Sequence, residues 1–237
     1  MRPRRRSIRF NAVAMRTSSS ARADPPSLDD VLNAARALGP QPGIPWPRAR
    51  WAEAFPQHRR LLDQLPELLT REAVRAVCAQ QPPTPQGALA GFVACMAWGH
   101  GTTGYGVHRT VQVLDLAGAE AGVRLASARQ AVMDHGALAG YDALAGTSRL
   151  IRLGPAFGTK FLFYQNEQAL ILDRLSGRWF KSVTDISLRP TVWRHDKYAV
   201  YLEHIQEWAA RDDLSPASVE QAAFQLMSER EGNQWAA

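Results

Sequence analysis

Cysteine is scarce in this chain of 237 residues, since Cys78 and Cys95 are the only two. They form no CxxC motif, and His100 and His108 have no third ligand at a metal-binding spacing. The sequence therefore predicts no zinc site, no cysteine-bound iron–sulfur cluster and no other cofactor. So few cysteines are consistent with a reducing cytoplasm.

Long apolar runs and strand patterns are also missing. No segment approaches the roughly 20 apolar residues that cross a bilayer, so we expect no membrane association. Alternating strand patterns are weak, and 161–164 and 169–172 could be helix or strand. Helical periodicity and caps such as Ser27 and Ser215 instead predict helices at 28–38, 48–55, 57–65, 70–80, 86–98, 106–116, 121–135, 137–145, 194–211 and 216–229. This pattern predicts an all-α fold of two lobes with a ligand cleft between them.

Acidic residues are absent from the first 23 positions, which contain seven arginines. We expect residues 1–26 to be a disordered basic arm, 27–232 a helical domain and 233–237 a tail. The arm could be a targeting segment, a DNA-binding tail, or a sign that translation starts at Met15. In the body, positive charge concentrates at 149–197, with nine basic and four acidic residues. That excess is typical of a surface that meets a phosphate backbone, although a solvated basic face would look similar.

The segment from Leu153 to Lys160, LGPAFGTK, carries the most chemistry. Its glycines predict a sharp hairpin at about 150–173 that opens a helix, whose first N–H groups would suit a phosphate. It is not a P-loop, because only three residues separate Gly154 from Gly158. Lys160 could act as an amine nucleophile, and Asp173 follows 13 residues later, after an apolar run.

These residues resemble the helix-hairpin-helix DNA glycosylases, in particular the 8-oxoguanine branch, with Ala156 at the position of the first hairpin glycine. The resemblance implies that Lys160 attacks the sugar and that Asp173 stabilises its positive charge. It also implies DNA-backbone contacts at the hairpin, from Gly154, Phe157, Gly158 and Thr159. The alternatives are a phosphate-binding or surface lysine at 160, and a helix cap or ion pair at Asp173.

A second resemblance lies in Glu220 and Phe224, which occupy the spacing of a base-reading glutamine and a stacking phenylalanine in the same branch. Residues four apart share one helix face, so both could line a base pocket. Because glutamate only accepts hydrogen bonds when ionised, it suits a base that offers donors, such as cytosine's amino group or guanine's N1–H. The alternative is a solvent glutamate and a core phenylalanine.

Trp98 and His100 lie in a glycine-rich stretch, 96–106, that could supply a stacking wall or a wedge for the gap left by a flipped base. The alternative is a core tryptophan and a surface histidine at the end of a helix.

Together these patterns predict a monomeric DNA glycosylase, with possible lyase activity, that acts on double-stranded DNA containing a damaged or modified base in the cytoplasm, at the nucleoid. Repair and defence against modified phage DNA both stay open, as does the identity of the base. The alternative is a noncatalytic helix-hairpin-helix DNA-binding protein.

Overall fold

Helix follows helix along the part of the chain that the computed structural model describes, residues 24–232. The basic arm over residues 1–23 and the tail at 233–237 lie outside it. The described residues form one 3-10 helix, η1 (Pro56–His58), one two-stranded antiparallel sheet, β1 (Ile44–Pro45) with β2 (Leu68–Leu69), and the α-helices α1 (Leu28–Arg36), α2 (Arg48–Ala54), α3 (Arg59–Gln64), α4 (Arg71–Ala79), α5 (Pro85–His100), α6 (Tyr105–Ala117), α7 (Glu120–His135), α8 (Ala137–Ala145), α9 (Pro155–Gln165), α10 (Arg174–Thr184), α11 (His195–Arg211) and α12 (Pro216–Arg230).

The predicted all-α fold is confirmed, and its helices begin where polar caps predict. Ser27 forms a capping box with Asp30 at the start of α1, and Ser215 accepts a hydrogen bond from the Ser218 N–H at the start of α12. Such caps pair N–H groups that a helix leaves without partners.

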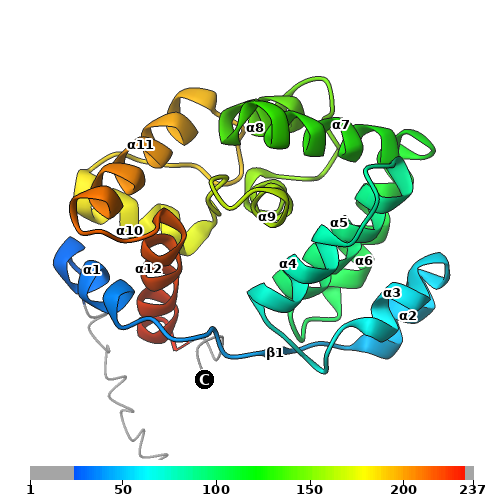
Figure 1. The fold of residues 1–237 in the computed structure, drawn as a ribbon, viewed down its shortest axis with the longest axis horizontal. Coiled ribbons are helices and arrows are strands. Elements are labelled where there is room, and N and C mark those ends of the chain that lie inside the picture. The colour runs from blue at the N-terminus through cyan, green and yellow to red at the C-terminus, as the bar shows by residue number, and fades with distance from the viewer. Residues whose placement is uncertain (1–23, 233–237) are drawn as a thin grey trace, which may run out of the picture.

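The helices form two groups (Figure 1). The terminal lobe joins both ends of the described chain, because α1 packs against α12, which also packs against α10 and α11. The central lobe contains α2 to α9, with α7 and α8 lying above α9 in this view. Sequence-distant segments therefore meet where the two lobes face each other.

Helix α9 is seen end-on at the centre of the molecule (Figure 1). It packs against α4, α5, α7 and α8, and the run Phe161–Tyr164 is buried. A helix that is apolar all round is typical of such a central position. The ambiguous segment 161–164 is thus helical, while 169–172 crosses from α9 to α10 without regular structure.

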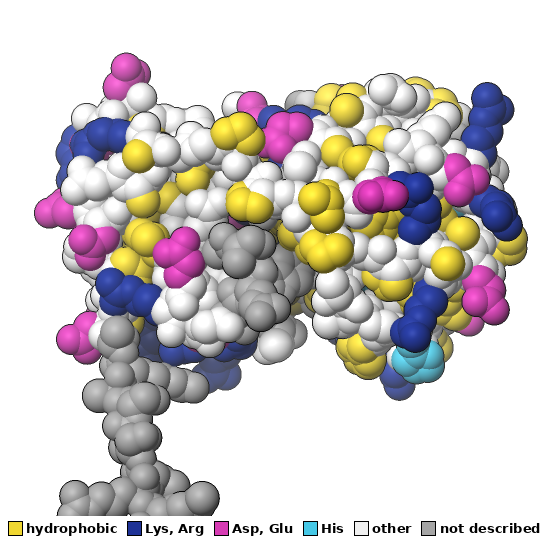
Figure 2. Space-filling model, turned by 90° about the horizontal axis from the view of Figure 1, so that it is seen from below, with side chains coloured by type: hydrophobic (Ala, Val, Ile, Leu, Met, Phe, Trp, Pro, Cys, Tyr) yellow, Lys and Arg dark blue, Asp and Glu magenta, His cyan; other side chains and the backbone are white. Residues whose placement is uncertain are grey.

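Charges of both signs are interspersed on the face seen from below, outside the part that undescribed atoms cover (Figure 2). The visible described part of this face has no single-sign patch. Within residues 24–232, no helix has the length and apolarity needed to span a membrane.

Candidate active site

A cavity of about 320 Å³ lies between the two lobes; we call it the interlobe cavity. The central lobe contributes side chains from α4, α5 and α9, and the terminal lobe contributes α10 and α12. Its lining residues are Arg71, Trp98, Gly99, Ala156, Phe157, Lys160, Ile171, Asp173, Arg174, Leu175, Glu220 and Phe224. Six of the candidate site residues therefore share one cavity, namely Lys160, Asp173, Glu220, Phe224, Trp98 and Phe157.

Lys160 and Asp173 form an ion pair in this cavity. Nζ of Lys160 lies 3.2 Å from Oδ2 of Asp173, and the two side chains are 8% and 13% exposed. Nζ also lies 3.5 Å from the carbonyl oxygen of Ala156, one turn back in α9. The amine is thus held at the cavity wall by one strong partner and one weak one.

The two oxygens of Asp173 have different partners. Oδ1 accepts hydrogen bonds from the N–H groups of Leu175 and Ser176, so Asp173 is also the N-cap of α10. Burial raises the pKa of Asp173, but Lys160 and these N–H donors outweigh it, and the pKa lies below its ordinary value. The carboxylate is therefore held ionised, with Oδ2 toward Lys160.

A short segment without regular structure, 169–172, brings Asp173 to Lys160. The N–H of Leu172 donates to Oγ1 of Thr159 at 3.0 Å, and that hydroxyl donates to the Pro155 carbonyl at 2.8 Å. Two tyrosine hydroxyls of α11 donate to the carbonyls of residues 170 and 171. Thr159 is completely buried, so its hydroxyl joins the segment to α9 instead of facing a DNA backbone.

Glu220 is also fully buried, and its partner is Arg71 of α4. Nη1 of Arg71 donates to Oε2 at 2.7 Å, and Nη2 to Oε1 at 3.4 Å. Burial raises the pKa of Glu220 while Arg71 counteracts it. The alternative of a solvent glutamate is wrong, because the carboxylate lies in the core beside the interlobe cavity.

Aromatic rings supply much of the remaining wall. Phe224 and Trp98 line the cavity from α12 and α5, and Phe157 lines it from the first turn of α9. Trp98 is 2% exposed, so it is a core residue whose ring also borders the cavity. Flat apolar walls around a few polar groups are typical of a site for a planar ligand.

A comparison with known protein families identifies the family of this chain. Residues 39–224 match the model of the family described as "Putative 8-oxoguanine DNA glycosylase OGG-like protein". The chain belongs to this family. No curated protein and no solved structure matches the chain. The family points to DNA as the partner. The matched range includes every residue that lines the interlobe cavity, and it leaves out α1 and the end of α12.

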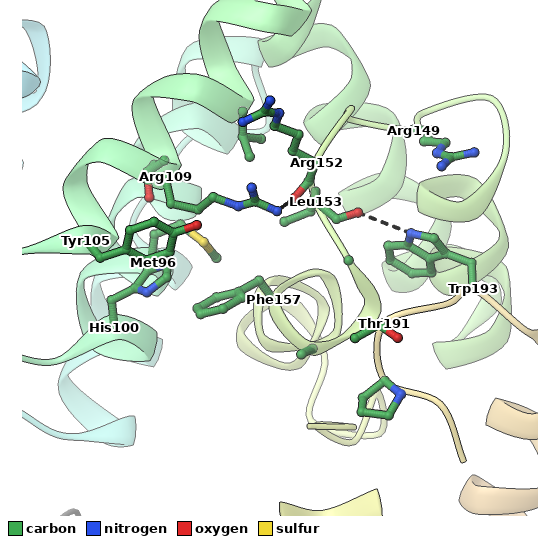
Figure 3. A pocket seen from close by; sticks show the side chains of 15 residues that line it. Met96, His100, Tyr105, Arg109, Arg149, Arg152, Leu153, Phe157, Thr191 and Trp193 are labelled. Carbon is green, nitrogen blue, oxygen red and sulfur yellow. Dashed lines mark hydrogen bonds between the residues drawn. The ribbon is translucent and has the colours of Figure 1, made fainter. Parts of the chain in front are cut away.

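A second cavity, of about 440 Å³, adjoins the first in this glycosylase-family chain; we call it the arginine cavity. Ala156 and Phe157 line both cavities. Figure 3 shows that Arg109, Arg149 and Arg152 line it, together with His100 at the end of α5 and Tyr105 at the start of α6. Arg109 donates to the carbonyl of Arg152 at 2.7 Å and so holds the loop before α9. Three cations that line one cavity would suit a phosphate.

His100 lines the arginine cavity and not the interlobe cavity. Its ring stacks on Phe157 with a centroid distance of 4.1 Å, and it is only 8% exposed, so the surface-histidine alternative is wrong. Desolvation, followed by the charges of Lys160 and Arg109, lowers its pKa to about 4. The imidazole is therefore neutral at pH 7.

The hairpin differs from the predicted phosphate-binding turn. Pro155 has no N–H, the N–H of Ala156 donates to the Pro190 carbonyl, and those of Phe157 and Gly158 donate to the Gly154 carbonyl. These first-turn donors of α9 are thus already paired. Gly154 lies at the arginine cavity, whereas Gly158 is buried against Trp193, whose indole N–H donates to Leu153 (Figure 3).

Two residues that contribute to the site were not predicted from the sequence. Arg71 lies 149 residues from Glu220, and no local pattern links them. Ser176 completes the capping box with Asp173. Its role could be predicted from the sequence, because two polar residues three positions apart have the spacing of a capping box. No group of three potential metal ligands from His, Cys, Asp or Glu occurs among residues 24–232.

Proposed function

We propose that this protein is a DNA glycosylase that takes a flipped base into the interlobe cavity and cleaves its N-glycosidic bond. The observation that carries the proposal is the ion pair of Lys160 and Asp173 in an aromatic-walled cavity between two lobes. Because a duplex hides the bond, the nucleotide must leave the stack, which costs about a few kcal/mol. Phe224 and Phe157 supply apolar rings to the wall beside the extruded base.

Lys160 is the proposed nucleophile. Its ammonium first gives up a proton to solvent, while Asp173, with Oδ2 3.2 Å away, stays ionised. The neutral amine attacks C1′ while the C1′–N bond to the base breaks. The electron pair of the broken bond leaves with the base, which takes up the proton that the attached amine nitrogen releases. The resulting amine–sugar adduct opens to a Schiff base, from which the strand can be cleaved by β-elimination. We therefore propose a glycosylase with lyase activity.

Asp173 is the proposed charge stabiliser. The sugar becomes cationic as the glycosidic bond breaks, and an ionised carboxylate lowers the energy of that state. The low pKa of Asp173 keeps the negative charge available at neutral pH. Its cap on α10 fixes the carboxylate before substrate arrives, so little reorganisation is needed.

DNA-backbone binding is assigned to the arginine cavity. Arg109, Arg149 and Arg152 line it, and Ala156 and Phe157 form its boundary with the interlobe cavity. Gly154 and Phe157 keep their proposed place at the DNA surface. We propose that Gly158 and Thr159 act by packing α9 and not by touching phosphate. The partner is a duplex with one damaged or modified base, bound by a cytoplasmic, nucleoid-associated monomer.

Single-turnover base release tests the proposal. The full chain, Lys160→Gln, and a control variant at an exposed lysine, Lys181→Gln, are incubated with duplexes that carry oxidised, deaminated, alkylated or phage-type modified bases. We expect the unsubstituted chain and Lys181→Gln to release at least one base, and Lys160→Gln to lose at least about 100-fold in rate. Strand cleavage in the same reactions measures the lyase step.

The panel also separates the rival functions. Release of oxidised or deaminated bases supports repair, and release of phage-type modified bases alone supports defence. Salt-dependent DNA binding without release of any base would contradict the glycosylase and favour a noncatalytic binding protein.

A further inference from the structure

One aromatic ring, that of Phe157, lies beside both the proposed nucleophile and His100. Nζ of Lys160 lies 5.4 Å from the centre of the Phe157 ring, and the two residues are three apart on α9, so they share a helix face. The imidazole of His100 stacks on the same ring, with centroids 4.1 Å apart and planes that differ by 19° (Figure 3). The Phe157 ring therefore connects the end of α5 with the Lys160 amine, at the boundary between the two cavities.

Two hydrogen bonds hold the Lys160 amine, and one of them is weak. Nζ donates to Oδ2 of Asp173 at 3.2 Å and to the carbonyl oxygen of Ala156 at 3.5 Å. A lysine side chain is long and flexible, and it loses much rotamer entropy when it is held in one conformation. Packing along the stem of Lys160 therefore has to supply part of the restraint.

Gly99, the residue before His100, allows this close packing. A Cβ at Gly99 would lie 3.0 Å from Cε1 of Phe157 and 3.1 Å from Cδ of Lys160, and both distances are shorter than ordinary van der Waals contacts. The two side chains thus pack directly on the backbone of α5. The stem of Lys160 is confined by this backbone and by the neighbouring Phe157 ring.

His100 is itself fixed by packing. A Cβ at Gly106 of α6 would lie 2.3 Å from Cβ of His100, so the α6 backbone packs directly against the histidine. Its Nε2 is buried and has no hydrogen-bond partner among residues 24–232. Desolvation, followed by the charges of Lys160 and Arg109, lowers the pKa of His100 to about 4, so the ring adds no second cation beside Lys160 at pH 7. An uncharged ring fixed between α6 and α9 is a suitable support for Phe157.

We propose that Phe157, supported by the ring of His100, is a positioning residue that keeps the Lys160 amine beside Asp173 at the wall of the interlobe cavity. The inference rests on the proposed function, because the position of the amine affects the rate only if Lys160 is the nucleophile. Without this ring, the stem would be free to turn toward the arginine cavity and away from the sugar. A displacement of about 1 Å at a reacting group can lower a rate by about 100-fold.

The position of Lys160 can be observed directly, because the chain has only three lysines. Lysine labelled with carbon-13 at Cε gives separate NMR signals for Lys160, Lys181 and Lys197, and Lys160→Gln and Lys181→Gln assign them. A nearby aromatic ring displaces such signals. We expect the Lys160 signal to lie apart from the other two, since neither Lys181 nor Lys197 is buried. The measurement uses the full chain at pH 7 without DNA.

The variants change the supports of Phe157 and leave Phe157 in place, because its own ring lines both cavities. His100→Ala removes the stacked ring, and His100→Phe replaces it by another ring. Gly99→Ala inserts a methyl group against Phe157 and the stem of Lys160.

Gly91→Ala is the matched control for Gly99→Ala. Gly91 lies about two turns earlier on the same helix, α5. A Cβ there would make ordinary contacts, 3.5 Å from Sγ of Cys78 and 3.7 Å from Nε2 of Gln165. This variant adds the same methyl group to α5 without reaching Lys160.

We expect the Lys160 signal to move in His100→Ala and in Gly99→Ala, and to stay in place in Gly91→Ala. Single-turnover base release should fall about tenfold or more in His100→Ala and about threefold or more in Gly99→Ala, and it should be unchanged in Gly91→Ala. In Gly99→Ala the protein concentration at half-maximal rate should stay within about twofold, because the loss lies in the reacting group and not in DNA binding. His100→Phe should restore the signal position and most of the rate lost in His100→Ala.

An unmoved Lys160 signal in folded His100→Ala protein would overturn the inference, as would an equal displacement in His100→Phe. A displaced signal with an unchanged rate would also overturn it, because the amine would then need no positioning. Melting temperatures report the fold of each variant, and if His100→Ala does not fold, Gly99→Ala decides by the same two measurements. If the unsubstituted chain releases no base, the proposed function fails, whereas the NMR signals report the support of Lys160 independently.

Discussion

Oδ2 of Asp173 lies 3.2 Å from Nζ of Lys160, while Oδ1 of the same carboxylate caps helix α10. One side chain thus has a structural oxygen and an oxygen that faces the proposed nucleophile. Because the cap fixes the carboxylate, the cavity presents a preformed negative charge beside the amine. The two roles can be separated by substitution.

Asp173→Asn retains a capping oxygen and removes the charge, whereas Asp173→Ala removes both. We expect both variants to lose base-release activity by about 100-fold or more, since both lack the carboxylate. Only the alanine variant loses the cap, so it should be less stable than the asparagine variant by about 1 kcal/mol. Urea unfolding and single-turnover kinetics measure the two effects. Near-normal rates in the asparagine variant would show that Asp173 is a cap alone.

Gly158 is expected to be intolerant of a side chain. A Cβ there would overlap the ring of Trp193 and lie 3.3 Å from Leu144, so Gly158→Ala should cost about 1–3 kcal/mol of stability. Gly154→Ala is the control, because a Cβ there has its nearest neighbour at 3.9 Å and φ is −94°. Equal stability of the two variants would contradict the packing role of Gly158.

His100 should make the fold sensitive to mild acid. The unfolded chain binds a proton at His100 near pH 6.5, whereas the folded chain resists until about pH 4. Stability is therefore lost as the pH falls from about 6.5 to about 4, by up to roughly 3 kcal/mol from this group. His100→Phe keeps a ring against Phe157 and should flatten the dependence over that range. The same slope in both proteins, measured by urea unfolding, would rule out this effect.

The arginine cavity should set part of the salt dependence of DNA binding. Log affinity for DNA falls as log salt concentration rises. Arg149→Gln and Arg152→Gln should each make this fall shallower by about one unit of slope, because each removes one phosphate-neutralising charge. Arg59→Gln, on the exposed side of α3, should leave the slope unchanged. Unchanged slopes in all three variants would place the DNA backbone elsewhere.

Most of the helices could be predicted from the sequence because their signals are local. The Ser27 capping box and the stops at Gly118 and Gly136 lie within a few residues of the helix ends that they mark. Helix α10 is not among the predicted helices, because its N-cap, Asp173, also fits the role of a catalytic carboxylate. The strands β1 and β2 are two residues each, too short for any periodicity.

The site could be predicted only in part. Lys160, Asp173, Glu220 and Phe224 were found through resemblance to a family motif, and the structure places them on one cavity. Their partners depend on tertiary packing. Arg71 reaches Glu220 across the two lobes, and the Pro190 carbonyl occupies a first-turn N–H of α9 that the motif alone left open for a phosphate.

Covalent trapping by borohydride tests the central claim, that Lys160 is the nucleophile, most directly. The chain has only three lysines, Lys160, Lys181 and Lys197, so the modified residue can be mapped without ambiguity. With a duplex whose base is released, reduction should link DNA to Lys160, and Lys160→Gln should give no adduct while Lys181→Gln gives a normal yield. Base release without any adduct, or an adduct on another amine that persists in Lys160→Gln, would contradict the account.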